Sequence, residues 1–221
     1  MRSPCYSRHD SLTGPAPEGI LDSDWSASMK LLSMLQMIFR AVTTPRQRIL
    51  VQEIPKGRVI DIGGGGEGVI ARVGGAAVVA IDKHISEIEE ARGQALDALW
   101  LVADATGLPF GSHSFDHATA FFSCMYMPAG VLQEVFRETH RVLKQGGEFW
   151  IWDAHMVPKG RVFAIRLQVR LADARTLNTV YGVKAKEQSA ASVGSLLQKA
   201  GFEWAVITRR ERWFFIKARS V

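Results

Sequence analysis

The pattern of apolar and polar positions changes several times along the chain. Between residues 26 and 42 apolar side chains recur at three- and four-residue steps, which predicts a helix. Pro45 interrupts this pattern, and the next stretch, residues 46–53, is predicted to form a second short helix. Residues 1–24 are rich in Ser, Pro and Gly and have weak periodicity, so they predict a mobile tail ahead of one domain spanning residues 25–221.

Short apolar runs alternate with amphipathic stretches through the middle of the chain. The apolar runs predict strands at residues 59–62, 77–81, 99–103, 117–122 and 148–152. The amphipathic stretches between them predict helices at residues 67–73, 86–94 and 131–143. Strands that are apolar throughout and separated by helices are typical of a parallel sheet covered on both faces. We therefore expect an α/β fold with a doubly wound, Rossmann-like core over residues 56–153.

The periodicity shifts to two residues after Pro158. Apolar residues from Ile165 to Leu171 share one parity, while Arg166, Gln168 and Arg170 occupy the other, which predicts a strand with one solvated face. This strand lies in an insertion over residues 157–188, after the fifth strand. A helix over residues 189–200 and strands at 204–208 and 213–218, close enough for a hairpin, are predicted to follow.

Composition agrees with a globular domain, since the 221 residues are 47% hydrophobic and 22% charged. The two cysteines, Cys5 and Cys124, lie 119 positions apart, so no disulfide framework is expected and a reducing cytoplasm is the predicted compartment. The first 25 residues lack the apolar core of a signal peptide, and no later run approaches the length that a membrane helix needs.

The most informative segment is residues 59–68, VIDIGGGGEG, where the first strand turns into the first helix. Gly63, Gly65 and Gly68 satisfy G-x-G-x-x-G, a pattern in which glycines let the backbone approach a ligand closely. This pattern alone also describes dinucleotide sites. However, Asp61 and Glu67 would face a pyrophosphate with two carboxylates, at a cost of roughly several kcal/mol.

Acids at the ends of three successive strands suggest a different ligand. Asp61 suits an ammonium group, and Asp82, 19 positions after Gly63, suits the hydroxyls of a ribose. Asp104, followed by Ala105, is placed to accept a hydrogen bond from an adenine amino group. Ribose, adenine and an amino-acid tail together describe S-adenosylmethionine.

With these residues in place, the chain resembles the class I S-adenosylmethionine-dependent methyltransferases, in particular their small-molecule group. The resemblance also rests on the segments GLPF (107–110), SFD (114–116), RVLKQGG (141–147) and KAGF (199–202). It implies a mostly parallel seven-stranded sheet with an antiparallel last strand, N-terminal helices and an insertion after strand five. It further implies S-adenosyl-L-methionine as cofactor and a small-molecule acceptor.

The resemblance assigns a set of residues to the cofactor. It places Asp61, Gly63 and Gly65 near the methionine part, Asp82 at the ribose and Asp104 at the adenine. The same site is predicted to include Glu67, Gly68, Lys83, Ala105 and Phe121. Glu67 stands where the family commonly has its third glycine, so its role is open between holding the ammonium group and capping the helix.

Catalytic candidates follow the fourth and fifth strands, where open α/β sheets bind ligands. His155 is the candidate base, against the alternative of an exposed loop histidine, and Tyr126 is a second candidate. A base is needed only if the acceptor atom carries a proton at working pH, since positioning supplies much of the rate. Cys124 is interpreted as a buried small residue, and Tyr181 in the insertion could line a pocket.

Two other functions stay open at this point: a nucleotide-dependent oxidoreductase and a catalytically silent binding domain of the same fold. The run FFSCMY (121–126) differs from the motif with which amino-methylating nucleic-acid enzymes present a flipped base, so nucleic acid is not the expected acceptor. No metal site is expected, and the sequence does not specify an oligomer.

The basic surplus is local. Of the net charge of +5, residues 159–186 contribute seven basic residues against one acid. This concentration favours an anionic acceptor or an anionic surface, against the alternative of a solvated strand face. If it favours the acceptor, replacing Arg166 and Arg170 by Gln should raise the acceptor's KM without changing cofactor affinity.

Overall fold

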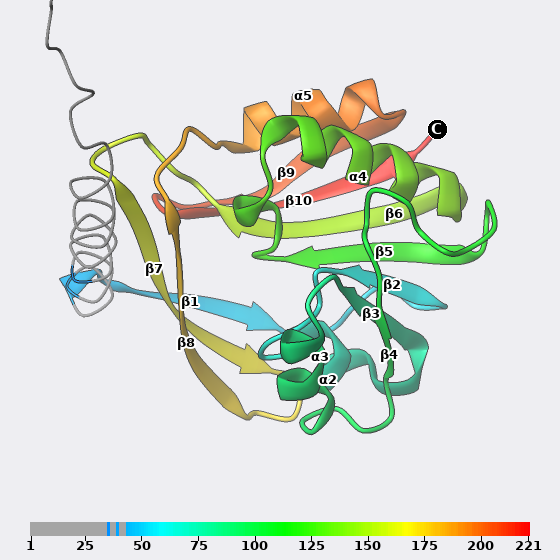
Figure 1. The fold of residues 1–221 in the computed structure, drawn as a ribbon, viewed down its shortest axis with the longest axis horizontal. Coiled ribbons are helices and arrows are strands. Elements are labelled where there is room, and N and C mark those ends of the chain that lie inside the picture. Colours follow the sequence, from blue (N-terminus) through cyan, green and yellow to red (C-terminus); the bar gives the residue numbers. More distant parts are fainter. Residues whose placement is uncertain (1–34, 36–38, 40–42) are drawn as a thin grey trace, which may run out of the picture.

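The computed structural model describes residues 35, 39 and 43–221, which form one seven-stranded and one three-stranded sheet with flanking helices (Figure 1). The predicted tail over residues 1–24, and all of the predicted helix over 26–42 except residues 35 and 39, lie outside this described part. None of the helices in the described part has the length and apolarity that a bilayer-spanning helix needs.

The seven-stranded sheet has the predicted topology. Its strands lie in the order β4 (Leu99–Val102), β3 (Val78–Asp82), β2 (Val59–Ile62), β5 (Phe115–Phe121), β6 (Leu143–Ala154), β10 (Trp213–Ser220) and β9 (Phe202–Arg209). Strands β2 to β6 pair in parallel, whereas β10 runs antiparallel to both of its neighbours. The mostly parallel sheet with an antiparallel last strand is thus confirmed.

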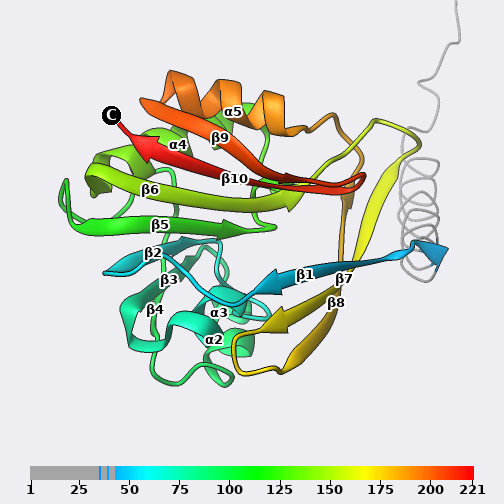
Figure 2. The same ribbon diagram turned by 180° about the vertical axis from the view of Figure 1, so that it is seen from behind.

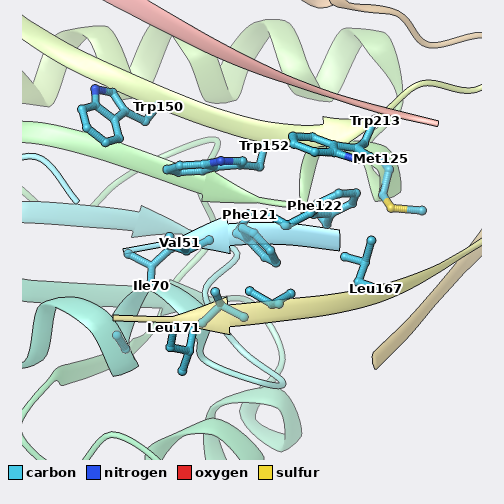
Figure 3. Close-up of a cluster of buried hydrophobic side chains, with 14 of the residues drawn as sticks. Val51, Ile70, Phe121, Phe122, Met125, Trp150, Trp152, Leu167, Leu171 and Trp213 are labelled. Atoms are coloured by element: carbon cyan, nitrogen blue, oxygen red, sulfur yellow. The ribbon is translucent and has the colours of Figure 1, made fainter. Parts of the chain in front are cut away.

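Both faces of this sheet are buried, as the apolar strands predict. The helices α4 (Ala129–Val142) and α5 (Ala190–Lys199) share one core with Phe149 and Ile151 of β6. The helix α2 (Val69–Gly74) belongs to a second core, which contains Trp150 and Trp152 from the opposite face of β6 (Figure 3). The remaining short elements are η1 (Gly75–Ala77), α3 (Ile85–Arg92) and η2 (Cys124–Tyr126).

The second, smaller sheet consists of β1 (Arg46–Val51), β7 (Val162–Leu171) and β8 (Thr176–Lys184), in that order. Strand β1 pairs in parallel with β7, and β7 and β8 form an antiparallel hairpin (Figure 2). The predicted helix over residues 46–53 is therefore wrong. Ile49 and Val51 are buried while Arg48 and Leu50 are exposed, so this short segment alternates as a strand does once β7 supplies its partner.

The smaller sheet has two unlike faces, which we call the inner and the outer face. The inner face carries Leu167 and Leu171, which point toward Phe121 and Phe122 at the end of β5 in Figure 3. The outer face carries Arg166, Gln168 and Arg170, which are partly or fully exposed. The one-sided strand predicted from the period of two is thus confirmed.

Candidate functional site

The glycine loop that follows β2 packs so closely that side chains would not fit. A Cβ on Gly64 would lie 2.4 Å from Asp61 Oδ2, and one on Gly65 would lie 2.5 Å from Glu87 Cβ. Gly63 has φ +69°, in the left-handed region, and a Cβ there would lie 2.6 Å from Ser123 Cβ. The loop therefore needs glycine for its own fold.

Asp61 is a buried carboxylate beside this loop. It is only 1% exposed, and Thr119 donates its hydroxyl to Asp61 Oδ1 at 2.8 Å. Burial raises the pKa of Asp61 to about 7, the Thr119 hydrogen bond opposes this rise, and the charge of Asp82 adds to it. A cationic group next to Asp61 would offset both the cost of burying its negative charge and the repulsion from Asp82. The position therefore fits the ammonium group that the sequence predicts.

The other two acids lie along the same edge of the sheet. Asp82 ends β3, is paired with Val102 of β4, and accepts the His84 backbone N–H on Oδ1 at 2.9 Å. Asp104, just after β4, accepts the backbone N–H and the hydroxyl of Thr106 on Oδ1, at 2.8 and 2.7 Å. These bonds lower the pKa of Asp104 and hold its carboxylate charged. Each acid keeps its second oxygen available to a ligand.

Glu67 is held by the smaller sheet. Thr179 and Tyr181 of β8 both donate their hydroxyls to the Glu67 carboxylate, Tyr181 at 2.9 Å. The helix α2 begins after Gly68, which has φ +57°, and it has no side-chain cap. Of the two roles considered for Glu67, the helix cap is therefore wrong. Glu67 instead connects the glycine loop to the inner face of the smaller sheet.

Glu87 of α3 adds a fourth carboxylate in or beside the loop, after Asp61, Glu67 and Asp82. Its backbone carbonyl accepts the Gly66 N–H at 2.9 Å. Burial raises the pKa of Glu87, and the negative charges of Asp82, Glu90 and Glu67 raise it further. Carboxylates that repel one another around a glycine loop fit a cationic ligand and oppose an anionic one.

Three of these contacts were not predicted: Thr119 to Asp61, Glu87 to the loop, and Thr179 to Glu67. Each joins residues from different strands or helices, and no motif marks them. The one available signal was the presence of Thr119 within an apolar strand, because a buried hydroxyl in such a run needs a hydrogen-bond partner.

Aromatic side chains meet at the end of β5. Phe121 ends the strand, and Phe122 follows with φ 51°, a left-handed conformation that is rare for a bulky residue. The ring of Tyr181 stacks on Phe122, with 5.6 Å between centroids and 26° between planes. Tyr126 lies nearby and is 51% exposed, and desolvation of the part of its side chain that is covered raises the pKa of its phenol to about 12. Tyr126 therefore keeps its proton near neutral pH and can donate a hydrogen bond but cannot act as an efficient base.

The end of β6 contains a second buried acid. Asp153 is fully buried, and its Oδ1 accepts the Ala154 N–H and the Gln188 amide, each at 2.7 Å. Burial raises the pKa of Asp153 to about 6 and raises that of the neighbouring Cys124 thiol, which agrees with Cys124 as an unreactive core residue. His155 follows the strand, is partly exposed, and donates its backbone N–H to Arg212 O at 2.9 Å.

The remaining predicted residues lie around this edge. Lys83 is exposed and Ala105 is partly buried next to Asp82 and Asp104. Within residues 43–221, no group of three or more His, Cys, Asp or Glu side chains is arranged to hold a metal ion.

Parts of this chain are similar to known proteins. A family model described as "Methyltransferase domain" matches residues 59–147. An uncharacterized methyltransferase from Synechocystis sp. is 31% identical over 150 residues, which is 67% of this chain and 68% of that protein.

A more distant relative and a solved structure extend the comparison. The ubiquinone/menaquinone biosynthesis C-methyltransferase UbiE from Cereibacter sphaeroides is 31% identical over 114 residues, and the matched segment spans 45% of its length. A solved SAM-dependent methyltransferase structure from Methanosarcina mazei superposes with a TM-score of 0.55 at 20% identity, covering 76% of this chain and 94% of that one. That likeness shows the fold.

Proposed function

Because this chain belongs to the class I S-adenosylmethionine-dependent methyltransferases, we propose that it methylates a small molecule. This acceptor is apolar and meets the cofactor where β5 and β6 end beneath the smaller sheet. The observation that carries this proposal is the Tyr181 ring, which stacks on Phe122 while its hydroxyl binds Glu67 of the glycine loop. Apolar rings thus directly adjoin the cofactor loop.

The acidic residues bind different parts of the cofactor. Asp61 binds the ammonium group, Asp82 accepts the ribose hydroxyls, and Asp104 lies on the adenine side. The bound cofactor supplies an activated methyl group on a sulfonium, which an in-line displacement transfers. Lys83, Gly68 and Ala105 border this site, and Glu67 fixes the loop against β8.

Apolar side chains exclude water from the acceptor side. Phe121, Phe122, Leu167 and Leu171 belong to one continuous apolar core between the two sheets (Figure 3). A dry surround strengthens the attraction between the carboxylates and a cationic group and keeps water from competing with the acceptor. If the acceptor atom loses a proton, His155 remains the candidate base, with Tyr126 as a hydrogen-bond donor.

The name of one relative and the positions of the basic residues bear on the chemical class of the acceptor. UbiE carries the name of an enzyme of quinone biosynthesis, whose products are apolar, and this supports an apolar acceptor here. The arginines that favoured an anionic acceptor, Arg166 and Arg170, lie on the outer face of the smaller sheet and point away from the apolar core. An anionic group on the acceptor would instead meet Lys186, which donates to Met127 O next to Tyr126.

An oxidoreductase using a nicotinamide cofactor is not favoured, since four carboxylates, those of Asp61, Glu67, Asp82 and Glu87, lie in or beside the loop where its pyrophosphate would bind. We also propose that residues 25–221 act as one domain in the cytoplasm.

Calorimetric titration with S-adenosylmethionine, S-adenosylhomocysteine and NAD tests the cofactor assignment. We expect heat from the first two ligands and none from NAD. A panel of prenylated quinols, sterols and hydrophilic carboxylic acids, assayed for methyl transfer by mass spectrometry, then tests the acceptor class. Methylation of the hydrophilic acids alone would contradict an apolar acceptor while leaving the cofactor site intact.

A further inference from the structure

The outer face of the smaller sheet concentrates cations. Strand pairing aligns three rows across β1, β7 and β8: Arg46–Arg166–Val180, Arg48–Gln168–Asn178 and Leu50–Arg170–Thr176. Four of these nine positions are arginine and none is acidic. A face with this charge attracts an anionic partner through its whole field rather than through a single contact.

The same face contains a shallow hollow of about 390 Å³ at the end where β1 finishes. Its lining joins two arginines to hydroxyl and amide groups: Arg48, Ile49, Leu50, Gln168, Arg170, Ala174 and Thr176. Guanidinium groups with neighbouring amide and hydroxyl donors are the groups that bind phosphate oxygens. The hollow therefore suits a phosphate group whose attached moiety points away from the sheet.

Exposed apolar side chains lie among the arginines. Leu50 is 54% exposed and Val180 is 46% exposed, at opposite corners of the face. Arginines mixed with exposed aliphatic side chains on one face match a lipid–water interface, where phosphates lie beside acyl chains. None of the nine residues is aromatic, so the face lacks the stacking platforms with which proteins bind single-stranded nucleic acid.

We propose that the outer face of the smaller sheet docks on an anionic membrane surface, with lipid phosphates at Arg46, Arg48 and Arg170 and with Leu50 and Val180 at the level of the upper acyl chains. Docking in this orientation places the inner face, and with it the aromatic end of β5, just beneath the bilayer surface. The inference goes beyond the proposed function, because the docking surface lies outside the methyl-transfer site.

Flotation of the full-length protein with vesicles tests this proposal. Vesicles of phosphatidylcholine alone are compared with vesicles in which about a third of the lipid is phosphatidylglycerol. We expect binding to the anionic vesicles, weakening as salt rises, and little binding to the neutral ones. Replacing Arg48 and Arg170 by Gln should weaken partitioning roughly 25-fold, at about fivefold for each arginine near a charged surface.

The matched control removes two other exposed arginines, Arg209 and Arg210, at the turn between β9 and β10. The Arg209→Gln/Arg210→Gln variant has the same net charge as the test variant and should bind vesicles like the wild type. Equal loss of binding in both double variants, or equal binding of the wild type to both vesicle types, would overturn the proposal. Retention of single-stranded RNA without vesicle binding would overturn it as well.

Calorimetry with S-adenosylhomocysteine separates this inference from the proposed function. Both double variants should bind this ligand as the wild type does, which shows that they are folded. Failure of the wild type to bind it would remove the proposed function but leave the vesicle result to stand on its own. Competition by inorganic phosphate at low millimolar concentration would identify a soluble phosphate site and contradict membrane docking.

Discussion

The two sheets place their functional groups by different geometric rules. In the seven-stranded sheet both faces of the inner strands β2 and β3 are buried, so the groups that we propose to bind ligand come from strand ends, where Asp61, Asp82 and the glycine loop meet. In the three-stranded sheet one face is buried, so alternate residues along a strand have different surroundings and different roles. Thr179 and Tyr181 hold the loop from the inner face, while Arg48 and Arg170 face outward.

This difference follows the bounds of the matched family model. The model ends at residue 147, before the smaller sheet's hairpin, and covers the strand ends that we propose to bind cofactor. The outer face, and the part of the proposed acceptor side that faces the ends of β5 and β6, belong to β1, β7 and β8. Changes in the large sheet should therefore affect cofactor binding, and changes in the small sheet should affect what is methylated and where.

The largest effect is expected at the glycine loop. Gly64→Ala places a Cβ against Asp61 and Ala80, and such overpacking costs about 3 kcal/mol or more, so S-adenosylhomocysteine binding should weaken more than about 100-fold. Gly107→Ala is the matched control, because a Cβ there meets nothing within 4 Å. Calorimetry and thermal melting measure both variants, and equal affinity in the two would contradict the close-packed loop.

Removing the ribose acid should have the next largest effect. Asp82→Ala deletes a charge-assisted hydrogen-bond acceptor and should weaken cofactor binding by about 1–3 kcal/mol, measured by calorimetry. Asp97→Ala removes an exposed acid away from the strand ends and should leave the affinity unchanged. An unchanged affinity for Asp82→Ala would take this residue out of the site.

The pH dependence of cofactor binding tests the buried acid. The pKa of Asp61 is about 7 and only its charged form attracts an ammonium group, so affinity should fall as pH drops through 7. The dissociation constant for S-adenosylhomocysteine should be about tenfold higher at pH 6 than at pH 8. The Asp61→Asn variant should bind weakly and show no such slope. A wild-type affinity that is the same at both pH values would contradict this role.

The smallest effect is expected when the hydrogen bond between Tyr181 of the smaller sheet and Glu67 of the glycine loop is removed. Tyr181→Phe keeps the ring on Phe122 but removes the hydroxyl that binds Glu67, at a cost of about 1 kcal/mol. We expect a severalfold loss in kcat/KM with little change in melting temperature. Combined with Glu67→Gln, the loss should be less than additive, because both variants break one bond. Strict additivity would show that the two residues act separately.

Most of the large sheet could be predicted from the sequence, because its strands are apolar throughout and end in acids or glycines, as at Asp61 and Asp82. Strand β1 could not, since its six residues include three basic or amide side chains before Ile49 and its partner strand begins more than 110 residues later. The role of Glu67 was missed for the same reason. The residues that donate hydroxyls to Glu67 lie on β8, far along the chain, and the sequence around Glu67 does not indicate this contact.

The pairing of β1 with β7 also bears on the order of folding. Arg46 pairs with Arg166, so the smaller sheet closes a loop of about 120 residues, which contains all of the strands that we propose to bind cofactor. Contacts so distant in sequence form late, because the chain loses loop entropy before it gains the contact. The cofactor edge can thus fold before the small sheet covers it. In native-state hydrogen exchange, the amides of β1 should open at a lower free energy than those of β2 and β5.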